Sequence, residues 1–134
     1  MRNIIFRGKR TDNGEWAYGY LVCQEEYSFI RVWNNDDFEW NEWIVAPETV
    51  GQYTGLNDKN GTKIFEGDIV KHYNYPGLPE SYGYELGCIF YDKYGASFRR
   101  TSMHIGVAEL GKDCRYEVIG NIHDNPELLE GDNL

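Results

Sequence analysis

Two carboxylates and an imidazole lie close together in the sequence, at Glu66, Asp68 and His72. Carboxylate oxygens and imidazole nitrogens are ligands for metal ions, and residues at this spacing can converge where the chain turns. The same residues have a conformational explanation, because an Asp next to Gly67 can cap backbone amides in a tight turn. We favour the turn, since the rest of the sequence offers no further ligand at the spacing of a known metal motif.

The other candidates for catalysis or ion binding each lack part of the required pattern. His123 precedes Asp124, but no Ser or Cys motif completes a triad, and Asp124 can instead cap a helix. The acidic residues of the 36–42 segment lack the spacing and the closing Glu of a calcium loop, which indicates a solvated face. Glycine patterns that bind nucleotides are absent. The sequence therefore predicts no enzymatic activity, no metal and no cofactor.

The three cysteines, Cys23, Cys88 and Cys114, cannot all pair with one another, and none lies in a Cys-x-x-Cys arrangement. This usage is typical of a reducing cytoplasm. Cys23 and Cys88 stand beside apolar residues, so we expect small buried side chains rather than nucleophiles. No signal peptide is present, and no apolar run has the ~20 residues that a membrane span needs. We expect a soluble cytoplasmic protein that does not bind membranes.

Composition predicts a folded, mainly β protein and limits its partners. Of the 134 residues, 41% are hydrophobic and 16% aromatic, and 15 are glycine, which suits strands joined by tight turns. The net charge of −9 opposes unaided binding to nucleic acid, because Lys and Arg supply most of the affinity for phosphates. Where basic residues do cluster, we expect solvated strand edges. The clusters are Arg2, Arg7, Lys9 and Arg10, and Arg99 with Arg100.

Runs rich in β-branched and aromatic residues predict strands along most of the chain. They are expected at residues 4–9, 15–22, 27–33, 38–45, 49–53, 69–73, 88–91, 96–99 and 117–122. The first two form a hairpin closed by Asn13-Gly14, and a bulge or a change of face is expected near 43–45, where the alternation slips. The longest irregular segment is expected between Lys71 and Gly87. A short helix is expected from Pro126, capped by Asp124 or Asn125 and ended by Gly131.

The strand expected at 15–22 has an aromatic row on one face, formed by Trp16, Tyr18 and Tyr20, and small or apolar residues on the other. Either face can be the buried one. Aromatic rows most often form core, so we expect these rings to be buried. The alternative is a platform on which bases stack, but such platforms normally lie in a basic groove.

Four blocks of the sequence carry a family resemblance. They are Phe6-Arg7-Gly8-Lys9 with Asp12-Asn13-Gly14-Glu15-Trp16 and Tyr18-Gly19; Pro47-Glu48-Thr49-Val50-Gly51-Gln52-Tyr53-Thr54-Gly55-Leu56; Ile64-Phe65-Glu66-Gly67-Asp68-Ile69-Val70; and Val118-Ile119-Gly120-Asn121-Ile122-His123-Asp124-Asn125-Pro126-Glu127-Leu128-Leu129. In this order they resemble the YopX family of small proteins encoded by phages and prophages of Gram-positive bacteria. No pattern is recognised in the 71–115 region.

The resemblance implies a mostly β protein whose later part is an SH3-like small β-barrel, and it brings no catalytic residues. The expected strands place an N-terminal antiparallel meander before this barrel and one short helix after it. At this length we expect a single compact domain, residues 1–134, with a subdivision into a meander (1–48) and a barrel region (49–134).

Three functions stay open. The first is a non-catalytic protein-binding module of a phage, which engages a host or phage protein through Tyr75, Tyr82 and Tyr84, because Tyr supplies large contact area at low entropic cost. The second is association with nucleic acid through the basic clusters, or mimicry of DNA by acidic side chains. The third is a metal-dependent enzyme built from the carboxylates and histidines named above. The aromatic excess is also compatible with a homo-oligomer.

Overall fold

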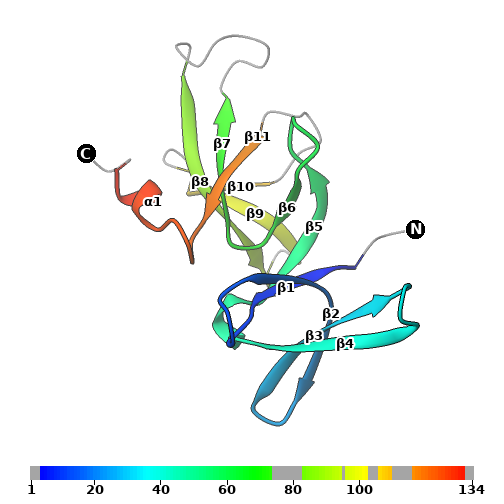
Figure 1. The fold of residues 1–134 in the computed structure, drawn as a ribbon. Coiled ribbons are helices and arrows are strands. Elements are labelled where there is room, and N and C mark those ends of the chain that lie inside the picture. Colours follow the sequence, from blue (N-terminus) through cyan, green and yellow to red (C-terminus); the bar gives the residue numbers. More distant parts are fainter. Residues whose placement is uncertain (1–3, 74–82, 95, 103–105, 110–115, 132–134) are drawn as a thin grey trace. The chain divides into compact units, whose positions relative to one another are not determined.

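Strands dominate the chain, as Figure 1 shows, and one short α-helix lies near the C-terminus. The computed structural model describes residues 4–73, 83–94, 96–102, 106–109 and 116–131. The predicted mainly β fold is confirmed. The chain divides into two compact units, Met1–Tyr53 and Thr54–Leu134. That the two behave as a single domain stays a prediction.

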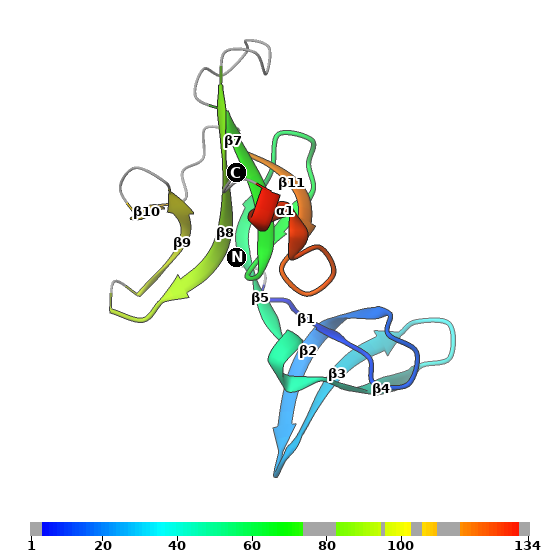
Figure 2. The ribbon, with the colours of Figure 1, turned by 90° about the vertical axis from the view of Figure 1, so that its left-hand side faces the viewer.

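The first unit is an antiparallel sheet in which the strands have the order β4-β3-β2-β1-β5 (Figure 2). Its elements are β1 (Phe6–Lys9), β2 (Trp16–Gln24), β3 (Tyr27–Asn34), β4 (Glu39–Val45), the 3-10 helix η1 (Pro47–Thr49) and the first residues of β5 (Gly51–Asn57). The hairpin between β1 and β2 is confirmed. Gly14, with φ of 75°, donates its amide to the carbonyl of Arg10 at 3.0 Å, and glycine adopts this φ without steric cost.

The inner face of this sheet holds the core of the first unit. Ala17, Ile30 and Val45 are buried, and Ile30 lies opposite Leu21 in β2 and Trp43 in β4. Side chains that are opposite one another on paired strands share a face, so these residues pack together. Phe6, Val32 and Val50 complete the cluster from its margin.

Strand β4 alternates regularly, so the prediction of a bulge or a change of face near 43–45 is wrong. Its pairing with β3 runs without a shift from Val45 opposite Ser28 to Glu39 opposite Asn34. Val45 faces inward, and Ile44 points to solvent with 43% of its surface exposed. The sequence looks irregular here only because an apolar residue occupies an outward position.

The aromatic row of β2 faces outward, so the expectation that it forms core is wrong. Tyr18 and Tyr20 keep 49% and 59% of their surface exposed, whereas Ala17 keeps 6%. The cause lies on the opposite face at Gly19, where an added Cβ would strike the backbone carbonyl of Arg31. At position 19 of β2 only glycine fits, because the backbone of β3 approaches it this closely. The rings of Tyr18 and Tyr20 point to the other side of the sheet.

The sheet of the first unit curls so that the end of β4 meets the end of β1. An isolated bridge joins Arg10 to Val45, and the amide of Ala46 donates to the carbonyl of Lys9 at 2.8 Å. The hydroxyl of Thr49 accepts the Lys9 amide at 2.8 Å and donates to the Ala46 carbonyl at 2.6 Å. These bonds satisfy backbone groups at the edge of β4 near Val45.

The second unit contains a five-stranded antiparallel sheet with the order β10-β9-β8-β7-β11. The strands are β7 (Asp68–Tyr73), β8 (Tyr84–Asp92), β9 (Ser97–Ser102), β10 (Gly106–Glu109) and β11 (Tyr116–Asn121). The end of β5 pairs with β6 (Lys63–Phe65). Ile64, Val70, Ile89 and Tyr116 form the buried core. No closed barrel is seen among the described residues, so the SH3-like barrel is not confirmed.

The irregular segment expected between Lys71 and Gly87 is shorter than predicted. Strands β7 and β8 pair in register as far as Tyr73 opposite Tyr84, because Tyr73 and Tyr84 continue the alternation of their strands. Residues 74–82 lie outside the described part of the chain. Strand β10 has no counterpart among the expected strands.

The predicted C-terminal helix is confirmed as α1 (Glu127–Gly131). The turn before it is held by Asn121, whose side-chain oxygen accepts the amides of His123 and Asp124 at 3.0 and 2.9 Å. At the start of the helix the Leu128 amide donates to the Asn125 carbonyl at 3.1 Å. Within the described residues no helix is long and apolar enough to cross a membrane.

Candidate functional site

The outward side of strands β2, β3 and β4 carries aromatic side chains around one ion pair. Arg31 lies between Tyr20 and Glu42 across the three strands, and Trp33 lies opposite Trp40. Alternation along each strand places these residues on the side away from the core. We call this surface the aromatic face; its residues are Tyr18, Tyr20, Arg31, Trp33, Trp40 and Glu42.

The rings of the aromatic face are packed against one another and still exposed. Tyr20 and Trp40 meet edge to face with centroids 6.0 Å apart, and Trp33 meets Trp40 at 5.4 Å. Tyr20, Trp33 and Trp40 keep 59%, 42% and 44% of their surface exposed. Edge-to-face packing is a favoured arrangement of aromatic rings and fixes their orientation. The face therefore presents ordered rings to solvent.

One ion pair lies at the centre of the face. Nε of Arg31 lies 2.8 Å from Oε1 of Glu42, and the guanidinium carbon of Arg31 lies 4.7 Å from the centroid of the Trp40 ring. The guanidinium of Arg31 thus forms an ion pair with the Glu42 carboxylate and a cation–π contact with the Trp40 ring. Arg31 contributes little free positive charge to the surface.

The turn between β3 and β4 borders the aromatic face and carries further exposed groups. The side-chain oxygen of Asn34 accepts the amides of Asp36 and Asp37 at 2.9 and 3.4 Å, which shapes the turn. Phe38 follows with φ of 52° and with 79% of its surface exposed. A bulky residue rarely adopts a positive φ. The turn therefore holds a large apolar ring in solvent beside two carboxylates.

The tyrosines predicted to bind a partner are not brought together by the described structure. Tyr75 and Tyr82 lie outside the described residues. Tyr84 opens β8 with 43% of its surface exposed, and Nζ of Lys71 lies 4.6 Å from its ring centroid. A role for these three residues stays a prediction.

The proposed metal ligands near Gly67 have other partners. Asp68 is 2% exposed, and its Oδ2 accepts the amide of Phe65 at 2.7 Å, which is the turn-capping role. His72 stacks on Tyr116 with ring centroids 5.0 Å apart. Among the described residues no group of three or more His, Cys, Asp or Glu side chains is placed to hold a metal ion.

A buried polar cluster lies across the second sheet. Nη1 of Arg100 donates to Oε2 of Glu85 at 3.1 Å, and Nη2 of Arg100 lies 3.1 Å from Nδ1 of His72. Because Arg can only donate, Nδ1 of His72 is the acceptor. The guanidinium also lies 5.9 Å from the ring centroid of Tyr116. The cluster pairs a buried charge through both terminal nitrogens of Arg100, while Nε of Arg100 is buried without a hydrogen-bond partner, and it has the character of a structural network.

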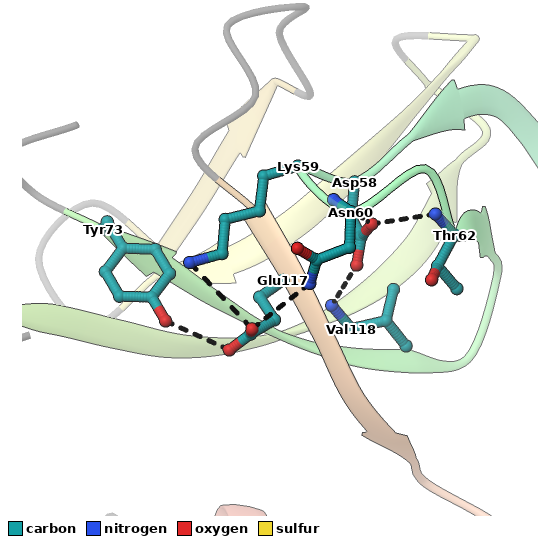
Figure 3. A network of polar contacts seen from close by, with 7 residues as sticks. All are labelled: Asp58, Lys59, Asn60, Thr62, Tyr73, Glu117 and Val118. Carbon is teal, nitrogen blue, oxygen red and sulfur yellow. Dashed lines mark hydrogen bonds and ion pairs between the residues drawn. The ribbon is translucent and has the colours of Figure 1, made fainter. Parts of the chain in front are cut away.

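A second polar network fixes the loop before β6 onto β11, and Figure 3 shows its side chains. Asp58 is 5% exposed and accepts the backbone amides of Asn60, Thr62 and Val118 at 2.8, 2.9 and 2.9 Å. Glu117 accepts the hydroxyl of Tyr73 at 3.0 Å. Nζ of Lys59 lies 3.9 Å from Glu117 and 4.0 Å from the ring centroid of Tyr73.

The basic clusters do not provide a surface of free cations in the described structure. Arg10 pairs with Asp12 at 2.7 Å, and Arg99 pairs with Asp92 at 3.0 Å. Arg7 is 6% exposed and lies over the ring of Trp16, so the expectation of a solvated strand edge is wrong there. Arg2 lies outside the described residues.

The cysteines differ from one another in exposure. Cys23 is exposed, so the expectation of a buried side chain is wrong for it. Cys88 is partly buried, and desolvation raises the pKa of its thiol to about 11, with smaller contributions from the charges of Asp68 and Glu66. A thiol with this pKa is a poor nucleophile at neutral pH. Cys114 lies outside the described residues.

The sequence contains an indication of which side of β2 faces solvent, and the prediction that the aromatic side is buried did not use it. Trp16, Tyr18 and Tyr20 were recognised as one row, but the small residues opposite them mark the buried side. A Gly within a strand indicates close approach of another backbone, and Gly19 supplies that indication. Which strands lie beside β2 could not be known from the row alone.

Comparisons with known proteins give a consistent result. A sequence model of the family described as "YopX protein" matches residues 5–130. The crystal structure of protein EF1440 from Enterococcus faecalis is similar, with a TM-score of 0.60 and 25% sequence identity. The similarity covers 96% of this chain and 99% of that chain. A comparison with curated proteins found no match.

Proposed function

Because the chain belongs to the YopX family, we propose that it is a non-catalytic module that binds a protein partner on the aromatic face. The observation that carries the proposal is the ordered cluster of exposed rings formed by Tyr20, Trp33 and Trp40. Single exposed apolar residues are ordinary, but a contiguous group on one sheet face is typical of an interaction surface.

The residue types of the face suit protein recognition. Tyr, Trp and Arg are the side chains that most often dominate the binding energy of protein interfaces. Their rings supply large contact area and lose little conformational entropy on binding. At Arg31, moreover, the ion pair with Glu42 fixes the guanidinium before any partner arrives.

The non-catalytic part of the proposal rests on how the reactive groups are used. Asp58 and Asp68 accept backbone amides, Glu85 pairs with Arg100, and Cys88 has a raised pKa. Each of these groups has a structural partner or a low reactivity, so none needs a catalytic explanation. We place the module in the cytoplasm of a host cell as a phage or prophage accessory protein, with a host or phage protein as its partner.

Affinity capture from phage-carrying host cells tests the proposal. The tagged protein, the Tyr20→Ala/Trp40→Ala double variant and the Tyr94→Ala variant are compared with and without nuclease. Tyr94 is 90% exposed in the turn after β8, so it controls for the loss of any exposed ring. A defined protein should be retained by the parent and Tyr94→Ala, and lost from the double variant, whether or not nuclease is added.

The opposite pattern would contradict the proposal. If the double variant retains the same proteins as Tyr94→Ala, the aromatic face is not the binding surface. If all retention disappears with nuclease, the partner is nucleic acid. Far-ultraviolet circular dichroism of each variant establishes that the comparison is between folded proteins.

A further inference from the structure

We infer that the aromatic face binds a positively charged, extended segment of its protein partner, whose Arg or Lys side chains stack on the exposed rings. This inference rests on the proposed function and specifies the chemistry of the partner. It is carried by the charge around the face, by the cation contacts within the chain and by the spacing of the rings.

The charge around the face is mainly negative. Residues 16–45, which contain β2, β3 and β4, include a single basic residue, Arg31, and six acidic residues. Strand β1 adds two basic residues beside β2: Arg7, which is 6% exposed and lies over Trp16, and Lys9, opposite Trp16. Arg31 is already paired with Glu42. The remaining acidic residues are Glu25, Glu26, Asp36, Asp37 and Glu39, and all are exposed. A partner segment that carries positive charge is attracted here, whereas phosphates and acidic segments are repelled.

The chain itself shows that its rings bind cations in this way. Arg31 lies over Trp40 at 4.7 Å, Arg7 over Trp16 at 4.7 Å and Arg10 over Trp43 at 5.0 Å, each measured to the ring centroid. An aromatic face carries partial negative charge, which attracts a guanidinium or ammonium group. Tyr20 and Trp33 present their exposed surface to solvent beside Arg31, so a second cation would find the same environment.

The rings form one contiguous platform that is large enough for more than one side chain. The Trp40 centroid lies 6.0 Å from that of Tyr20 and 5.4 Å from that of Trp33. In an extended chain, side chains on one face repeat every second residue at about 6.7 Å. Two cationic side chains of an extended segment can therefore contact the platform at once, and the carboxylates of the β3–β4 turn lie beside its Trp33 and Trp40 end.

A second copy of this chain is a poorer occupant. Its described arginines at positions 10, 31, 99 and 100 are already paired with carboxylates. Two copies that meet through this face would also bring like charges together, because an isologous contact places the same carboxylates opposite one another. Charge complementarity therefore favours a different chain.

A peptide titration tests the inference directly. The probe is a fluorescein-labelled peptide of about nine residues that alternates Ser and Arg, so that the Arg side chains share one face. A matched peptide has citrulline in place of Arg, which keeps the size and planarity of the group, removes the charge and replaces one nitrogen by a carbonyl oxygen. The anisotropy titration should show saturable binding of the Arg peptide, at least about tenfold tighter than that of the citrulline peptide, and weaker at higher salt.

Two pairs of variants locate the binding. Tyr20→Ala should weaken the Arg peptide about threefold to fivefold, as expected for one exposed cation–ring contact, and Tyr94→Ala should leave it unchanged. Asp36→Asn/Asp37→Asn should weaken it as well, whereas Glu127→Gln, an exposed residue of the second unit, should not. These positions are exposed, so the variants are expected to fold.

Several outcomes would overturn the inference. Absence of saturable binding, equal binding of the citrulline peptide or equal effects of Tyr20→Ala and Tyr94→Ala each contradict it. Tighter binding of a single-stranded oligonucleotide at the same face would assign the rings to bases instead. A dimer in sedimentation equilibrium that Trp40→Ala dissociates would assign the face to a second copy. If affinity capture depends on Tyr20 and Trp40 while the Arg peptide does not bind, the proposed function stands and the inference about the partner fails.

Discussion

The carboxylate of Glu85 and the guanidinium of Arg100 lie 3.1 Å apart, and their side chains keep only 11% and 7% of their surface exposed. Arg10 and Asp12 lie closer, at 2.7 Å, but the side chain of Asp12 is 62% exposed. Burial rather than distance determines what the loss of a partner costs, because water can replace a partner only at the surface.

Replacement of Glu85 by Ala should therefore destabilise the protein strongly. The variant leaves the Arg100 charge buried without its carboxylate, which costs about 3 to 5 kcal/mol. Urea unfolding followed by far-ultraviolet circular dichroism measures the loss, because all four Trp residues lie in the first unit and would not report on the second. Asp12→Ala is the control and should leave the unfolding midpoint where it is. A midpoint shift of similar size in both variants would contradict the role of burial.

Replacement of Asp58 by Ala should detach the loop before β6 from β11. Three backbone amides lose their charged acceptor, and a buried donor without an acceptor is costly, so we expect a loss of about 3 kcal/mol in the free energy of unfolding. Hydrogen exchange at the Val118 amide should accelerate in the same variant. Asp36→Ala, in an exposed turn, serves as the control. Unchanged exchange at Val118 would show that Asp58 does not hold the loop.

The two described cysteines should react at very different rates. The raised pKa of Cys88 keeps its thiol protonated at pH 8, whereas Cys23 is exposed. Brief treatment with iodoacetamide at pH 8 should modify Cys23 first, and peptide mass mapping distinguishes the sites. Equal modification of both in the folded protein would contradict the desolvation of Cys88.

The same thiol should make stability depend on pH in the alkaline range. The pKa of Cys88 is raised from 9.0 to about 11 in the folded protein, so between these pH values the unfolded chain loses the thiol proton more readily than the folded protein. The stability that depends on the protonated thiol is therefore fully present below pH 9 and is lost as the pH rises to 11. The free energy of unfolding should fall over this range more steeply in the parent than in Cys88→Ala. If the free energy of unfolding changes with pH in the same way in the parent and in Cys88→Ala, the titration of Cys88 does not affect stability.

Gly19 should not tolerate even a methyl group. The Cβ of Gly19→Ala would meet the Arg31 carbonyl and approach Cγ2 of Val32 to 2.9 Å, and the backbone atom cannot move aside cheaply. We expect a loss of about 2 to 3 kcal/mol, as for other overpacked interiors. Gly14→Asn is the control, because its site is open and Asn tolerates the required positive φ. Thermal unfolding that gives the same midpoint for both variants would be the contrary result.

The sequence was sufficient for the local elements and insufficient for their surroundings. Asn13-Gly14 fixes a hairpin by its own conformational preferences, and Asp68 beside Gly67 fixes a turn in the same way. Both were predicted correctly because the cause lies within a few residues. Strand β10 (Gly106–Glu109) was missed because, among its four residues, only Val107 favours extended structure, although the strand pairs with the neighbouring β9.

The candidate site shows the same limit more sharply. The alternation of Trp16, Tyr18 and Tyr20 specifies that they share a face, but not whether that face is covered. Coverage depends on what packs against each side of the finished sheet, such as Ile30 and Val45, which share one core cluster with Ala17, and alternation within one strand does not specify these contacts. The acidic surroundings of the face, in contrast, were visible as a run of carboxylates between positions 36 and 42.

The separation of the core from the aromatic face allows the two to change independently. Ala17, Ile30 and Val45 hold the first unit together from one side of the sheet, and Tyr20, Trp33 and Trp40 stand on the other. Substitutions among the outward residues leave the inward packing intact, so the exposed surface can change while the scaffold stays the same. The same property makes this small sheet a suitable starting point for engineered recognition.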